Sequence, residues 1–143
     1  MARAQREVLR EIGAFTPDEN DDWRPLLPLL DDLPVYVNNE QVTSLLRVFE
    51  RFPESDGNGV FWDILHLIEA APAYEPELIR SITRSPTQMS LTMANRLLNS
   101  DTTEQSRARL LLLLRTIASD DTVSREARHQ AKDFLEYQLT KSR

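Results

Sequence analysis

The spacing of apolar residues is the feature that most restricts how this chain can fold. Apolar side chains recur every three or four residues along most of the sequence, as Val42, Leu45 and Phe49 do, and this is the period of one face of an α-helix. No stretch shows the sustained alternation of apolar and polar residues that is typical of a half-buried strand. The sequence therefore predicts an all-α protein with about seven helices.

Prolines and polar segments mark the expected ends of these helices. In residues 1–38 the pattern is irregular, because Pro25, Pro28 and Pro34 lack an N–H donor and restrict the residue before them, so only short helical turns are expected in 23–37. Residues 39–140 form the regular helical part. The expected helices span about 3–14, 39–52, 59–71, 75–84, 86–99, a segment around 110–114, and 122–140.

The connections between these helices are short, which favours antiparallel neighbours packed in pairs. We expect the pairs to form either a short HEAT-like solenoid or a compact bundle, and the 143 residues to form a single domain, 1–143. The run Leu110–Leu114 presents leucine on every side of its helix, and such a helix is usually enclosed by its neighbours. It is predicted to be the central helix, with Leu112 or Leu113 in the middle of the core.

The absence of cysteine excludes disulfides and thiolate metal sites, and it fits a reducing, cytoplasmic environment. The first residues mix arginine and glutamate with short apolar side chains, unlike the apolar stretch of an export signal. The longest aliphatic run, Leu110–Leu114, is far shorter than a membrane span needs. We therefore expect a cytoplasmic protein with no membrane partner.

Charge is distributed unevenly along the chain. Residues 1–77 carry 16 acidic and 6 basic side chains, a net charge of −10, whereas residues 78–143 carry 7 acidic and 11 basic ones, a net charge of +4. An acidic protein is a poor match for nucleic acid, whose phosphates require a basic face. A basic protein is the better candidate partner, although acidic loops also simply keep a chain soluble.

Catalytic signatures are missing from the sequence. The three glycines form no phosphate-binding loop, dinucleotide fingerprint or nucleophile elbow, and neither His66 nor His129 stands in a zinc-protease motif. We therefore expect no enzyme, no catalytic residues, no cofactor and no small-molecule substrate.

Two acidic segments match a calcium-binding loop only in part. In the segment that starts at Asp18, Trp23 occupies the glycine position and Leu29 the position of the final glutamate. In the segment that starts at Asp56, the last ligand position is Leu67. No metal site is expected at either.

One polar stripe follows the predicted helix 59–71. Trp62, His66 and Glu69 are spaced four and three residues apart, so they share a helix face opposite the apolar face that contains Ile64. This stripe is either a second packing face or a contact surface for a partner.

The segment Phe61–Glu69, followed by Asn95–Asn99, resembles helical immunity proteins of bacterial polymorphic toxin and contact-dependent growth inhibition systems, in which a W-x-x-x-H-x-x-E helix precedes a helix ending in R-[IL]-L-N. The segment 127–135, preceded by Asp120 and Asp121, looks like the second half of a HEAT repeat, so the resemblance covers about residues 60–135. It implies a cytoplasmic protein that binds and blocks a cognate toxin domain, often a nuclease, by stoichiometric occlusion. The alternative is a HEAT-like adaptor that scaffolds two cellular proteins.

A basic toxin would be attracted by the acidic loops of the N-terminal half, where side chains remain available to a partner. Trp23 lies among these carboxylates, either as an aromatic anchor for the partner or as a cap on the core. The candidate partner-binding residues are Asp18, Glu19, Asp21, Asp22, Trp23, Asp31, Asp32, Glu54 and Asp56, with Trp62, His66 and Glu69 as a second candidate surface.

Overall fold

The computed structural model describes residues 4–100 and 102–141. Within these ranges the chain forms eight α-helices, one short 3-10 helix and no strand, so the predicted all-α fold is confirmed. The additional helix lies in the proline-rich segment, where only short turns were expected. The helices are α1 (Gln5–Ala14), α2 (Leu26–Asp31), α3 (Asn39–Arg51), α4 (Phe61–Ala70), α5 (Glu75–Arg84), α6 (Gln88–Asn99), α7 (Glu104–Ala118) and α8 (Arg125–Lys141), with the 3-10 helix η1 at Gly57–Gly59.

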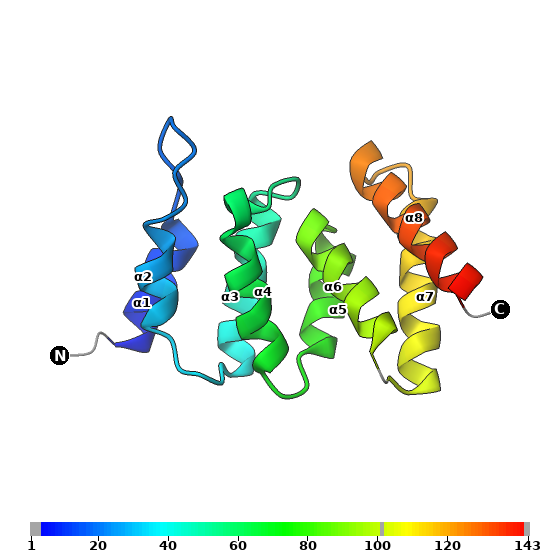
Figure 1. Cartoon of the computed structure of the whole chain (residues 1–143), viewed down its shortest axis with the longest axis horizontal. Coiled ribbons are helices and arrows are strands. Elements are labelled where there is room, and N and C mark those ends of the chain that lie inside the picture. Colours follow the sequence, from blue (N-terminus) through cyan, green and yellow to red (C-terminus); the bar gives the residue numbers. More distant parts are fainter. Residues whose placement is uncertain (1–3, 101, 142–143) are drawn as a thin grey trace.

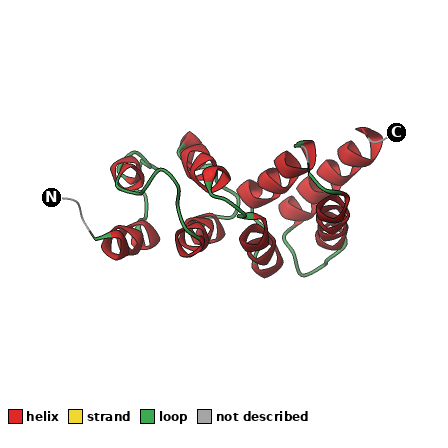
Figure 2. Cartoon of the chain, turned by 90° about the horizontal axis from the view of Figure 1, so that it is seen from below, coloured by secondary structure: helices red, strands yellow, loops and turns green. Residues whose placement is uncertain are grey.

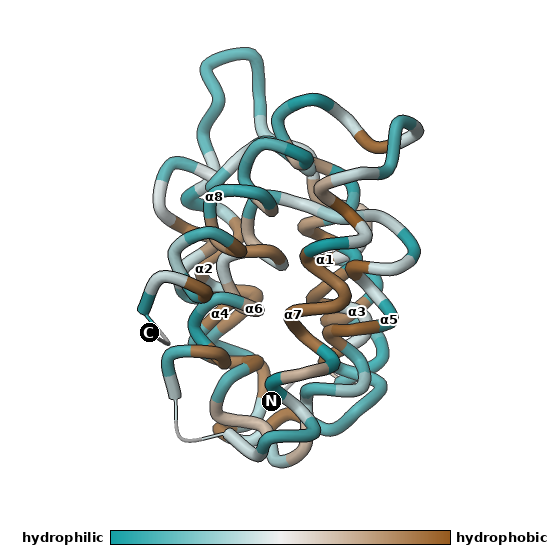
Figure 3. Tube along the Cα trace, turned by 90° about the vertical axis from the view of Figure 1, so that its right-hand side faces the viewer, coloured by the Kyte–Doolittle hydropathy of each residue, from teal (hydrophilic) through white to brown (hydrophobic). Residues whose placement is uncertain are grey.

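Consecutive helices form four antiparallel hairpins that stand side by side along the long axis of the molecule (Figure 1). Figure 2 shows the two rows that result, and Figure 3 labels their members: α1, α3, α5 and α7 form one row, and α2, α4, α6 and α8 form the other. Apolar residues gather where the two rows face each other (Figure 3). The arrangement is therefore the stacked, solenoid-like one of the two that the sequence left open.

Side-chain caps fix where two of these helices begin. Asn38 accepts a hydrogen bond from the Gln41 amide, Gln41 returns one to the Asn38 amide, and this capping box starts α3. Thr87 and Ser90 form the same device at α6. Because Thr87 occupies the N-cap position, α6 begins two residues later than predicted, and Pro86 lies before the helix.

The prolines of residues 23–37 permit a short helix because of where they fall. Pro25 is the N-cap of α2 and Pro28 lies in its first turn, where backbone N–H groups have no partner within the helix. Leu26 and Leu30 of α2 are buried against the rest of the core. The N-terminal segment is therefore part of the helical stack.

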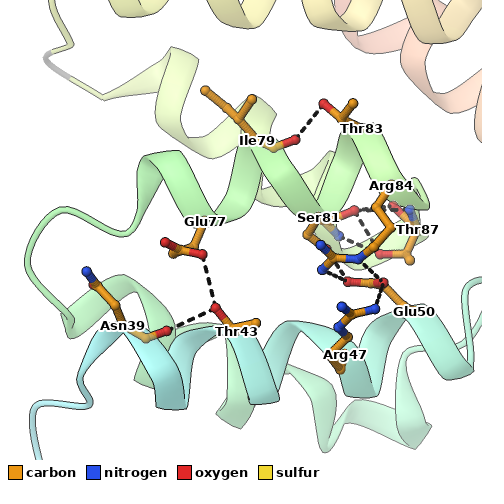
Figure 4. A network of polar contacts seen from close by, with 11 residues as sticks. Asn39, Thr43, Arg47, Glu50, Glu77, Ile79, Ser81, Thr83, Arg84 and Thr87 are labelled. Atoms are coloured by element: carbon orange, nitrogen blue, oxygen red, sulfur yellow. Dashed lines mark hydrogen bonds and ion pairs between the residues drawn. The ribbon is translucent and has the colours of Figure 1, made fainter.

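A polar network joins α3 to α5 within one row (Figure 4). The nearly buried Glu50 carboxylate accepts hydrogen bonds from the Arg84 guanidinium at 2.8 and 2.6 Å and from the Ser81 hydroxyl at 2.8 Å. The hydrogen bond to Glu50 raises the pKa of Arg84. A second contact, from the Thr43 hydroxyl to Glu77 at 3.0 Å, lies further along the same pair. The charge near the core is thereby satisfied, as buried carboxylates require.

The prediction that α7 is the central helix is wrong. It belongs to the last hairpin and packs mainly on α8, so one of its sides faces solvent. Leu110, Leu114 and Ile117 form the buried face, whereas Leu112 is 61% exposed and Leu113 is only half-buried. Five leucines in a row fill the core side of a helix wherever it stands in the stack.

The placement of α7 predicts that Leu114 and Leu112 contribute differently to the free energy of unfolding. Leu114→Ala is expected to lower the free energy of unfolding by about 2–5 kcal/mol, because it leaves a cavity in a closed core. Leu112→Ala, its matched control on the exposed side of the same helix, is expected to stay within about 1 kcal/mol of the parent. Urea unfolding followed by circular dichroism measures both, and similar losses at the two positions would contradict the placement of α7.

Candidate partner-binding edge

Successive helices run in opposite directions, so the connections within all four hairpins meet at the same edge of the molecule, at the top of Figure 1. Three of these connections are rich in carboxylates: 15–25 between α1 and α2, 52–60 between α3 and α4, and 119–124 between α7 and α8. We call this surface the acidic edge. Its carboxylates are Asp18, Glu19, Asp21, Asp22, Glu54, Asp56, Asp120 and Asp121, with Glu126 in the first turn of α8.

Asp31 and Asp32 do not belong to this edge. They stand at the end of α2 from which the chain enters the 32–38 connection, on the opposite edge of the stack (Figure 1). The candidate carboxylates of the N-terminal half are therefore divided between two edges of the stack. Their separation follows from α2, which carries the chain from one edge to the other.

Hydrogen bonds join the first two acidic connections. The Asn58 side chain donates to the Asp21 carbonyl at 2.8 Å and to the Asp21 carboxylate at 3.1 Å. Asp18 Oδ1 accepts from the amides of Asn20 and Asp22 at 2.9 and 3.1 Å. The two loops enclose an open recess of about 560 Å³ between them. The carboxylates of Asp18 and Asp21 are thus committed to the shape of the loop.

Trp23 is buried, with 3% of its surface exposed. Its ring packs edge-on against Phe52 and Phe61, at centroid distances of 4.8 and 4.9 Å, and is tilted against Phe15 at 5.7 Å. The indole N–H donates to Asp21 Oδ1 at 2.9 Å. Of the two roles considered for Trp23, the structure gives it the cap on the core, and its ring is not available as an anchor for a partner.

The connection that carries Glu54 and Asp56 passes directly over the aromatic cluster. Gly57 has φ +60°, and a Cβ added there would lie 2.5 Å from the Phe61 ring. Only glycine fits both the backbone conformation and the space. The acidic turn therefore lies directly over the buried ring of Phe61.

Like charges meet between the second and third acidic connections. Repulsion from the Glu126 carboxylate raises the pKa of Glu54 above its usual value, and a hydrogen bond between the two side chains adds to the same shift. By contrast, hydrogen bonds from Arg24, with Nε 2.8 Å from Oδ1, lower the pKa of Asp22. The edge thus contains one pair of carboxylates that repel each other, Glu54 and Glu126, and one carboxylate, Asp22, that is paired with an arginine.

Three residues of the edge were missed by the sequence reasoning: Asp120, Asp121 and Glu126. They belong to the half of the chain whose net charge is positive, so composition drew attention away from them. The expected stack of antiparallel hairpins could have pointed to them, because in such a stack the fourth hairpin turns at the same edge as the first. Asp120 accepts hydrogen bonds from Thr122, which lower its pKa, and Asp121 lies 3.6 Å from Arg128.

The residues of the second candidate surface, Trp62, His66 and Glu69, have different environments: Glu69 and Trp62 contact α6, whereas His66 is exposed. Arg96 of α6 donates to Glu69 at 2.7 and 2.8 Å, and its guanidinium lies 5.6 Å from the centre of the Trp62 ring. These contacts join α4 to α6. Trp62 is 37% exposed, and His66 is exposed.

The described residues contain no group of three or more histidines and carboxylates placed to hold a metal ion. Over the same residues, none of the helices combines the length and the apolar character needed to cross a bilayer.

The contact between Glu54 and Glu126 predicts that the pKa of Glu54 depends on the charge of Glu126. Glu126→Gln removes the repelling charge, so the pKa of Glu54 is expected to fall toward its ordinary value. Carboxyl-detected NMR titration of the parent and the variant measures the change. Asp133→Asn, an exposed substitution further along α8, serves as the control and should leave Glu54 unchanged. An unchanged Glu54 pKa in Glu126→Gln would show that the two connections do not meet.

Comparisons with protein-family models, with curated proteins and with solved structures found no match.

Proposed function

We propose that this protein binds and neutralises a basic toxin domain as a stoichiometric immunity protein. The observation that carries the proposal is the acidic edge, because three connections far apart in the sequence bring their carboxylates to one surface. Residues 15–25, 52–60 and 119–126 together hold nine carboxylates and two arginines, and one of these, Arg24, is paired with Asp22.

An acidic edge of this kind complements a partner protein that itself binds phosphates. A nuclease toxin needs a basic surface for its substrate, and a surface rich in carboxylates competes for the same positive charges. Long-range attraction between the two would accelerate their association, which matters for an inhibitor that must act before its target does. Occlusion of the toxin's substrate surface is the mechanism that follows.

The resemblance of residues 60–135 to helical immunity proteins supports the same function and implies a cytoplasmic site of action. The alternative is a HEAT-like adaptor that links two cellular proteins, and the stacked hairpins suit it as well. Genomic position separates the two: a toxin gene immediately upstream favours immunity, whereas an unrelated operon favours the adaptor.

The experiment uses carboxylates that have no role in the fold. Glu19 forms no hydrogen bond or ion pair within the described residues, and Glu54 and Glu126 repel each other. The triple variant E19Q/E54Q/E126Q therefore removes charge from the edge, and the glutamines at 54 and 126 can still form a hydrogen bond with each other. Its control, E40Q/E104Q/E136Q, changes net charge equally; Glu40 and Glu104 begin α3 and α7 at the opposite edge, and Glu136 lies along α8.

Both variants and the parent are measured by stopped-flow against the product of the adjacent upstream gene, across a salt series. The edge variant is expected to associate about tenfold more slowly than the parent at low salt, and the difference should shrink as salt rises. The control should associate nearly as fast as the parent. Equal association rates for the edge variant and the parent would refute the acidic edge as the binding surface, and failure of the two gene products to bind would refute the proposed partner.

A further inference from the structure

A groove between α2 and α4 is distinct from the acidic edge. The six-residue helix α2 lies beside this groove of about 420 Å³. The groove is lined by apolar side chains from both helices, Leu27 and Leu30 from α2 and Leu67 and Ala70 from α4. Leu27 and Leu67 are half-buried, and Ala70 is exposed.

Acidic side chains flank this apolar lining. Asp31 from α2 and Asp63 from α4 both line the groove, and both are exposed. Neither carboxylate has an ion-pair or hydrogen-bond partner among the described residues. His66, an exposed residue of α4, also lines it. The groove thus combines apolar contact area with two unsatisfied negative charges.

We propose that the α2–α4 groove binds an amphipathic helix of a partner protein whose bulky apolar residues are flanked by lysine or arginine. The apolar residues would contact Leu27, Leu67 and Ala70, and the basic ones would pair with Asp31 and Asp63. We commit to a helix as the occupant because the apolar lining comes from the faces of two helices and carboxylates flank it, and an amphipathic helix presents apolar residues beside basic ones along one face. The proposal does not rest on the proposed function.

The groove and the acidic edge are different surfaces. Asp31 lies at the end of α2 remote from the edge, Asp63 lies in the first turn of α4, and none of the residues that line the groove belongs to the three acidic connections. The edge offers charge with a buried tryptophan beneath it, whereas the groove offers charge together with apolar side chains that a partner can reach. A segment that binds the groove must therefore be apolar as well as basic.

The test uses a synthetic amphipathic helical peptide of leucine and lysine as the probe. Two control peptides replace its lysines with glutamate or its leucines with alanine. Binding to the whole protein is measured by isothermal titration calorimetry, with a circular dichroism melt of each variant to establish that it is folded. The parent is expected to bind the leucine–lysine peptide at least tenfold more tightly than either control peptide.

Two groove variants and their matched controls locate the binding. Ala70→Trp fills the groove, and Ala108→Trp places the same side chain on the exposed face of α7. D31N/D63N removes the flanking charges, and E19Q/E54Q/E126Q removes charge from the acidic edge instead. The two groove variants are expected to bind the leucine–lysine peptide about tenfold or more weakly than the parent. The two control variants are expected to bind it within about twofold of the parent.

Equal binding by Ala70→Trp and the parent would overturn the proposal. So would a loss in E19Q/E54Q/E126Q as large as that in D31N/D63N, because the peptide would then respond to charge alone. Tight binding of the glutamate peptide would show that the groove recognises apolar surface without basic flanks, and this too would overturn it. None of these outcomes bears on the toxin association rates, so the two proposals fail separately.

Discussion

The contact of Trp23 with Phe52 and Phe61 determines how the N-terminal third of this protein is arranged. Trp23 belongs to the connection between α1 and α2, Phe52 ends α3 and Phe61 begins α4. Burial of these rings holds two successive hairpins together at the same edge of the stack. The aromatic cluster also fixes the positions of the carboxylates in the 15–25 and 52–60 connections, which lie beside it. Apolar packing thus holds the first two acidic connections together, and the alternating direction of the helices brings the third to the same edge.

The same coupling explains the loop chemistry. Asp21 accepts the indole N–H of Trp23 and also receives the side chain of Asn58, so one carboxylate joins the ring to the neighbouring turn. Gly57 permits that turn to pass over Phe61. Residues that resembled parts of calcium-binding loops therefore have structural roles in this fold. The carboxylates left for a partner are those without such roles, Glu19 and Glu54 among them.

Much of the helical pattern could be predicted from the sequence, because the apolar period and the capping residues act locally. Helix α5 begins and ends where the pattern placed it, at residues 75 and 84. The place of a helix in the stack could not be predicted in this way: Leu110–Leu114 would read the same in a central helix or a terminal one, and only tertiary packing exposes Leu112. The division of the candidate carboxylates could not be predicted for a similar reason, because only the direction of α2 in the stack places Asp31 and Asp32 at the far edge.

The most direct test of this account is whether Glu54 and Glu126 lie together in solution. The chain has no cysteine, so E54C/E126C contains the only two thiols in the protein, and E54C/E104C is a control pair on opposite edges. A short bismaleimide reagent is added, and intramolecular cross-linking is followed by mass spectrometry. The account predicts rapid cross-linking of the 54/126 pair and little of the 54/104 pair. Equal cross-linking of the two pairs, or none at 54/126, would contradict it, because the stacked hairpins would then not assemble the acidic edge.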